Sequence, residues 1–124
     1  MASPGSQSEM IAQIDREFRR FRIHTGFFEQ AVAEQLGLNR TDLNVIMLLH
    51  DAISMTAGEI AQATSLTTGA VTAVIDRLER NGFARRERNS ADRRCVVVKL
   101  APQRRRQGPY GLVLRSVLSR RPAD

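Results

Sequence analysis

The sequence is poor in cysteine and has no long hydrophobic run. It has 124 residues and a single cysteine, Cys95, so an intramolecular disulfide is excluded and nothing indicates an oxidising compartment. No apolar stretch approaches the roughly 20 residues of a membrane-spanning helix. The first residues lack the basic and then apolar segments of a secretory signal. We therefore expect a single-domain cytoplasmic protein without a membrane partner.

Motifs typical of enzymes and cofactor sites are also missing. We find no glycine-rich phosphate loop, no Gly-x-Ser-x-Gly elbow and no His/Cys set at metal spacing. His24 and His50 have no cysteine partner and would make a poor zinc site. Cys95 opens an apolar segment, which is more typical of a small buried hydrophobe than of a redox switch. The sequence predicts no enzyme, no cofactor and no metal.

The positive charge is concentrated in the second half of the chain. Residues 1–60 carry five arginines and eight acidic residues, whereas residues 61–124 carry 14 basic and five acidic residues. Of the 19 basic residues only Lys99 is a lysine, and arginine forks suit phosphates and base edges. A basic half on a small domain indicates a nucleic-acid partner.

Aromatic residues are few, and their placement bears on the kind of nucleic acid. There is no tryptophan and only one tyrosine. Four of the five phenylalanines precede residue 30, outside the basic half. Proteins that bind RNA or single strands need exposed stacking rings, so this distribution favours double-stranded DNA. The alternative is a basic protein that binds DNA or RNA without sequence preference or effector control.

Residues 1–8 are small and polar and predict a flexible tail, and residues 9–37 predict one long helix that ends at Gly37. Apolar positions along this helix alternate in steps of three and four, which is the spacing of a coiled-coil seam. Thr25 and Gly26 weaken the pattern. An ordinary core-facing helix remains an alternative, but the paired phenylalanines favour contact with a second copy. The predicted dimerisation residues are Ile11, Ile14, Phe18, Phe21 and Phe28.

Residues 38–101 predict a compact lobe of three short helices and a β-ribbon. Residues 39–42 resemble a helix cap, and residues 43–51 continue as a helix. Thr56 and Glu59 form a capping box for a helix through residue 63, and Thr67 caps another that ends at Asn81-Gly82. Residues 83–88 and 95–100 then alternate as two strands. The expected fold is mainly α with a small β-hairpin wing, a winged helix-turn-helix.

The second helix of this pair and the ribbon carry the residues suited to DNA. Thr67, Thr68 and Gly69 are small enough for close approach to a groove floor, and Thr72 continues the same exposed face. Arg77 and Arg80 lie further along the helix, where they suit backbone contact. The loop between the strands carries Asp92, Arg93 and Arg94, and an arginine at such a tip can enter the minor groove.

Several motifs in order resemble the MarR family of bacterial transcriptional regulators. They are residues 38–43, 56–61, 76–83 and the Asp92-Arg93-Arg94 segment before an apolar strand. The resemblance implies a homodimer on a pseudo-palindromic operator, acting as a ligand-responsive repressor, with a small aromatic effector. It also implies that Arg94 is the wing arginine, held by an ion pair with Asp92. Arg77 and Arg86 would bind phosphates.

The segment 102–124 departs from the family, whose members normally continue through two more helices. Pro102 is expected to break the pattern, and Arg104–Arg106 to form a solvated cluster. A short amphipathic helix carrying Leu112, Val113, Val117 and Leu118 is expected to restore part of the dimer contact. An effector cleft is one interpretation, and plain core packing another, for a set that lies between the long helix and the lobe. That set is His24, Phe27, Phe28, Met47 and His50.

Overall fold

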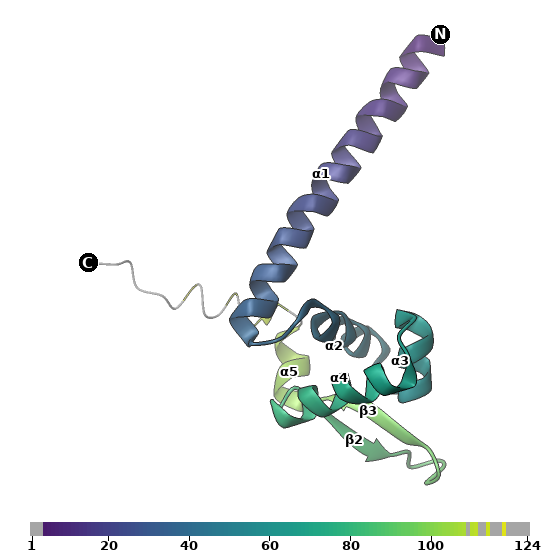
Figure 1. Ribbon diagram of the computed structural model, residues 1–124, viewed down its shortest axis with the longest axis vertical. Helices are drawn as coiled ribbons and strands as arrows, with labels where there is room; N and C mark the ends of the chain where they lie inside the picture. Colours follow the sequence, from purple (N-terminus) through teal and green to yellow (C-terminus); the bar gives the residue numbers. More distant parts are fainter. Residues whose placement is uncertain (1–3, 109, 112–113, 115–117, 119–124) are drawn as a thin grey trace, which may run out of the picture.

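The computed structural model describes residues 4–108, 110–111, 114 and 118. In chain order the elements are α1 (Pro4–Leu36), α2 (Arg40–Ala52), β1 (Met55–Thr56), α3 (Ala57–Thr64), α4 (Thr68–Arg80), β2 (Ala84–Arg88), β3 (Val96–Leu100) and α5 (Pro102–Gln107). Figure 1 shows α1 as a long rod that rises from a lobe containing the other elements. The expected mainly helical fold with a β-hairpin wing is confirmed.

Helix α1 is longer than predicted. Its 33 residues span about 50 Å at 1.5 Å per residue. Residues 4–8 form its first turns, so the predicted flexible tail is wrong there; Pro4 stands at the helix start, where its missing N–H costs nothing. Within the helix, the Thr25 hydroxyl donates to the Phe21 carbonyl oxygen at 2.7 Å. None of the helices in the described part of the chain is long and apolar enough to cross a membrane.

Only the last turns of α1 pack on the lobe. Val32, Ala33 and Leu36 contact Leu43 of α2 in a small apolar cluster. The same helix face continues outward without a partner among the described residues, and Phe18 and Phe21 expose 62% and 69% of their surface. The five predicted dimerisation residues are all exposed: Ile11, Ile14, Phe18, Phe21 and Phe28.

The predicted helix caps are confirmed. Asn39 caps α2 and accepts from the Asp42 N–H at 2.7 Å, while the Asp42 carboxylate returns a bond to the Asn39 N–H. Thr56 and Glu59 form the expected capping box of α3. The Thr67 hydroxyl caps α4 by accepting from the Ala70 N–H at 3.1 Å. These local hydrogen bonds satisfy amide groups that a helix start leaves unpaired.

The three-stranded sheet packs against α4, and residues of both belong to the main core. The strands pair antiparallel in the order β1-β3-β2, and β1 was not expected from the sequence. One face of α4 enters the main core with Val71, Val74, Ile75 and Leu78, all buried. The opposite face of α4 is exposed. The core therefore fixes which side of α4 is available for binding.

The segment after β3 binds back to the lobe. β3 ends at Leu100, so Pro102 does end the strand pattern as expected; it also begins the helix α5, which was not expected. The predicted solvated cluster is wrong for two of its arginines: Arg104 lies 4.3 Å from the ring centre of Phe83, and Arg105 donates to backbone oxygens of α2. Leu114 and Leu118 are exposed. Leu112, Val113 and Val117 of the predicted C-terminal helix lie outside the described residues.

We expect Arg105→Ala to lower the free energy of unfolding by about 2 kcal/mol. The guanidinium caps the end of α2 through Leu49 O at 2.8 Å, Ile53 O at 3.1 Å and His50 O at 3.2 Å. Charge-assisted bonds of this kind each contribute about 1.5–3 kcal/mol, and partial exposure reduces their sum. Urea unfolding measures the change, with the exposed Arg106→Ala as control. Equal stability of the two variants would contradict this role.

Candidate nucleic-acid interface

The first turn of α4 presents small side chains that the fold leaves exposed. Thr67, Thr68, Gly69 and Thr72 are all exposed, as predicted. A Cβ added to Gly69 would meet no atom within 4 Å, and its backbone needs no positive φ. Nothing in the part of the chain that the structure describes therefore requires a glycine at this position. The missing side chain leaves room for an external partner to approach the backbone.

Two of the threonine hydroxyls already make internal hydrogen bonds. Thr67 Oγ1 caps the helix, and Thr72 Oγ1 donates to the Thr68 carbonyl oxygen at 3.0 Å. The exposed Thr72 side chain has thus used its only donor, and its hydroxyl oxygen remains available as an acceptor. Hydroxyl and methyl groups of this kind suit base edges and the thymine methyl.

The wing loop is held by backbone contacts. Asn89 accepts from the Ala91 N–H at 2.9 Å, and Arg88 donates to the Arg93 carbonyl oxygen at 2.9 Å. Asp92 accepts from the backbone N–H of Arg94 at 3.0 Å. The structure shows no ion pair between Asp92 and the Arg94 guanidinium, so Asp92 shapes the loop rather than holding that side chain. The side chains of Arg93 and Arg94 are left exposed at the tip.

Arg77 was predicted to bind phosphate, but the structure gives its guanidinium an internal partner. Its Nη2 lies 2.9 Å from Asp42 Oδ1, and its Nε donates to both carboxylate oxygens at 3.2 and 3.3 Å. This hydrogen bonding raises the pKa of Arg77 above its usual value, against the opposing effect of burial. Arg77 joins α4 to the start of α2.

Arg86, the other predicted phosphate ligand, is also paired. It contacts Asp76 at 2.8 Å and Glu79, and its backbone N–H donates to Glu79 at 3.2 Å. The bond to Asp76 is the main cause that raises the pKa of Arg86. Arg86 therefore ties β2 to α4. Among the described lobe residues, the exposed arginines without a carboxylate partner include Arg80, Arg93 and Arg94.

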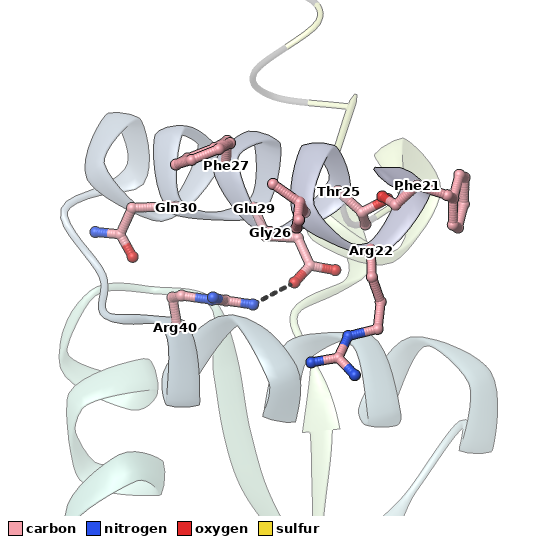
Figure 2. Close-up of a pocket in the computed structure, with 9 residues that line it drawn as sticks. Phe21, Arg22, Thr25, Gly26, Phe27, Glu29, Gln30 and Arg40 are labelled. Carbon is pink, nitrogen blue, oxygen red and sulfur yellow. Dashed lines mark hydrogen bonds and ion pairs between the residues drawn. The ribbon is translucent and has the colours of Figure 1, made fainter. Parts of the chain in front are cut away.

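Among the described residues, two open grooves each hold only one of the predicted effector residues. Phe27 lines an open groove of about 540 Å³ beside α1, and Met47 lines a separate one of about 460 Å³ between α2 and α3. His24 and His50 line neither of these grooves. Figure 2 shows the first groove, where Arg40 of α2 pairs with Glu29 beneath α1 at 3.0 Å while Phe27 lies on the other side of the helix.

Two of the five effector candidates do meet, through a residue that the sequence analysis missed. The ring of Tyr110 lies 5.2 Å from that of Phe28, and its hydroxyl donates to Met47 Sδ at 3.3 Å. Burial raises the pKa of Tyr110, and repulsion from Glu29 adds to this, so the hydroxyl stays protonated. A lone tyrosine beyond Pro102 gives no local pattern that would predict this contact.

Asp42 was identified as part of a cap, but its burial was not expected. It is the buried acidic residue of the lobe, 1% exposed, and it pairs with Arg77 of α4. The signal available in the sequence was its position directly before the apolar series that starts at Leu43. A carboxylate at that place must be paired if the helix is buried.

Known proteins match both the sequence and the fold. Residues 38–96 match the MarR family. YcgE of Bacillus subtilis (strain 168), an uncharacterized HTH-type transcriptional regulator, is 44% identical over 98 residues, which cover 79% of this chain and 64% of YcgE. The transcriptional regulator BldR from Sulfolobus solfataricus has a TM-score of 0.59 at 26% identity, covering 89% of this chain and 79% of BldR.

A DNA-bound structure shares the fold. Reduced AbfR bound to DNA has a TM-score of 0.60 at 22% identity, over 98% of this chain and 88% of AbfR. The helices, the capped α4 and the ribbon thus define a winged helix-turn-helix protein. Residues 38–96, the part of the chain that forms this lobe, resemble the MarR family, and the relatives are named as transcriptional regulators rather than enzymes. It spans less than two-thirds of the length of the curated relatives that it matches.

Proposed function

We propose that this protein is a transcriptional regulator that binds double-stranded DNA sequence-specifically, as a homodimeric repressor. The observation that carries the proposal is the exposed first turn of α4, where the fold does not require the glycine at position 69 and the neighbouring threonines leave the backbone accessible. Both α4 and the β2–β3 ribbon lie on the side of the lobe away from α1 (Figure 1). The helix can therefore enter a major groove while Arg93 and Arg94 reach the flanking minor groove.

The homodimer is supported by the exposed apolar face of α1. This face runs from Ile11 to Phe28 and then continues into the cluster at Val32 that packs on the lobe. A second α1 presents the same surface, as a two-fold dimer requires. Such a dimer carries two copies of α4, which fit two half-sites about one helical turn apart. The DNA-bound AbfR structure shows that a protein of this fold binds DNA.

The resemblance to the family also implies a small aromatic effector. The space between α1 and α2 that such a molecule would enter holds the ring of Tyr110, packed between Phe28 and Met47. An effector at this place would have to displace that ring. The proposal of a DNA-binding regulator does not depend on it.

Selection of bound duplexes from a random pool at about 150 mM salt tests the proposal. We expect an enriched pseudo-palindrome, because the dimer carries two equivalent recognition helices. Binding to all duplexes with equal affinity would replace the proposal by the nonspecific alternative. Preference for single-stranded or RNA competitors would have the same consequence.

Variants of the first turn of α4 test which residues read the bases. We expect Thr68→Ala to change the selected sequence while leaving affinity for random duplex nearly unchanged. Gly69→Ala is expected to fold normally, because the added Cβ meets no atom of the chain, and to lose operator affinity. Selection with each variant and thermal unfolding provide the measurements. A uniform loss across all duplexes would show that this turn does not read sequence.

A further inference from the structure

An ion pair between a buried carboxylate and a partly exposed arginine joins the candidate recognition helix to the start of α2. The side chain of Asp42 is only 2% exposed, and both of its oxygens are bonded to Arg77 of α4. The same carboxylate accepts from the N–H of Asn39, the residue that caps α2. Asp42 thus forms hydrogen bonds to α4 and to the α1–α2 junction.

This junction also contacts α1. Leu38 N–H donates to the Ala33 carbonyl oxygen at 2.8 Å, and Arg40 pairs with Glu29 of α1. A continuous set of polar contacts therefore leads from the last turns of α1, through residues 38–42, to Arg77. In a dimer formed through α1, these contacts set the angle between each α4 and the dimer axis.

We propose that Asp42 and Arg77 are positioning residues that fix α4 relative to α1, and that Arg77 is not a phosphate ligand. The inference rests on the proposed function, because it assumes that α4 reads DNA. A guanidinium bound through Nε and Nη2 has two fixed donors and therefore one orientation. An ion pair whose carboxylate is buried is weak evidence for stability but is well suited to fix the register of packed helices.

The charges around the pair support this division of roles. Arg80 is one turn further along α4, exposed and without a carboxylate partner among the described residues, so it is the helix cation available to a phosphate. Arg77 is only 38% exposed and has its partner inside the protein. A phosphate that took the Nε–H or the bonded N–H of Nη2 would have to displace a carboxylate that is only 2% exposed.

The test compares Asp42→Asn, Arg77→Gln and the double variant with Arg80→Gln as the matched control. The double variant leaves no unpaired buried charge, so it keeps the test valid if a single variant unfolds. Binding to the selected operator and to random duplex is measured over a range of salt concentrations. Thermal unfolding by circular dichroism confirms that each variant tested is folded.

We expect Asp42→Asn and Arg77→Gln each to weaken operator binding by about tenfold, with random-duplex affinity nearly unchanged. The double variant should lose no more than either single variant, because both changes remove one interaction. The slope of affinity against salt should stay at the wild-type value for Arg77→Gln. For Arg80→Gln the slope should fall by about one, and the operator preference should be kept.

Two results would overturn the inference while leaving the proposed function intact. One is a wild-type protein that selects an operator, with Arg77→Gln lowering the salt slope and Asp42→Asn having no effect. The other is additive losses in the double variant. A wild-type protein that selects no operator would instead remove the proposed function itself.

Discussion

Replacing both Phe18 and Phe21 with glutamate is expected to convert the dimer into a monomer and to abolish operator binding. Both rings are largely exposed on the same face of α1. A buried phenylalanine side chain contributes about 1.5–3 kcal/mol, and a two-fold dimer buries four of them. The loss of roughly 6–12 kcal/mol corresponds to several orders of magnitude in the dimer dissociation constant.

Analytical ultracentrifugation over a wide concentration range measures this change. We expect the wild-type protein to show a concentration-dependent monomer–dimer equilibrium, and DNA binding to follow the dimer fraction. The variant should remain monomeric at all concentrations. Its lobe should still fold, because neither ring belongs to the clusters that hold the lobe together.

Phe27→Glu provides a matched control on the same helix. Phe27 is nine residues after Phe18, which is two and a half helical turns, so it lies on the opposite side of α1. It is 72% exposed, and Figure 2 shows it on the side of α1 away from α2. We expect this variant to dimerise like the wild type. If the variant with both Phe18→Glu and Phe21→Glu still dimerises and Phe27→Glu does not, the interface lies on the other side of the helix.

The elements with strong local signals were predictable from the sequence. Asn39, Thr56 and Thr67 are cap residues whose hydrogen bonds reach only three residues along the chain, and all three caps are present. The exposed face of α4 followed from the spacing of its apolar residues. In contrast, the two-residue β1 has no periodicity of its own and exists only because it pairs with β3.

The roles of the arginines could not be read from local patterns. Arg77 and Asp42 are 35 residues apart, and Arg105 contacts carbonyl groups more than 50 residues before it. Their positions in sequence suggested phosphate contacts or a solvated cluster, since an unpaired arginine is normally exposed. Only the packing of α2 against α4 and of α5 against α2 brings these partners together. The interpretation of Arg94 as exposed did not depend on such contacts.

We expect Arg94→Ala to weaken operator binding by about 1–3 kcal/mol, or roughly tenfold to more than a hundredfold, without affecting the fold. The Arg94 side chain is exposed at the wing tip, and the structure gives its guanidinium no internal hydrogen bond or ion pair. In a narrow minor groove the guanidinium would be attracted by the negative potential and would form hydrogen bonds away from water, and both effects strengthen binding. Electrophoretic mobility shift at fixed salt measures the loss, and the unfolding midpoint should stay unchanged.

Variants of Asp92 distinguish two ways in which the wing could position Arg94. Asp92 accepts from the backbone N–H of Arg94, and an asparagine can make the same bond without the charge. If the contact with the backbone is what matters, Asp92→Asn should bind the operator like the wild type, while Asp92→Ala should lose part of the affinity that Arg94→Ala loses. If an ion pair with the guanidinium forms on DNA, both changes should weaken binding equally. Wild-type affinity in Arg94→Ala would show that the wing does not enter the groove through this residue.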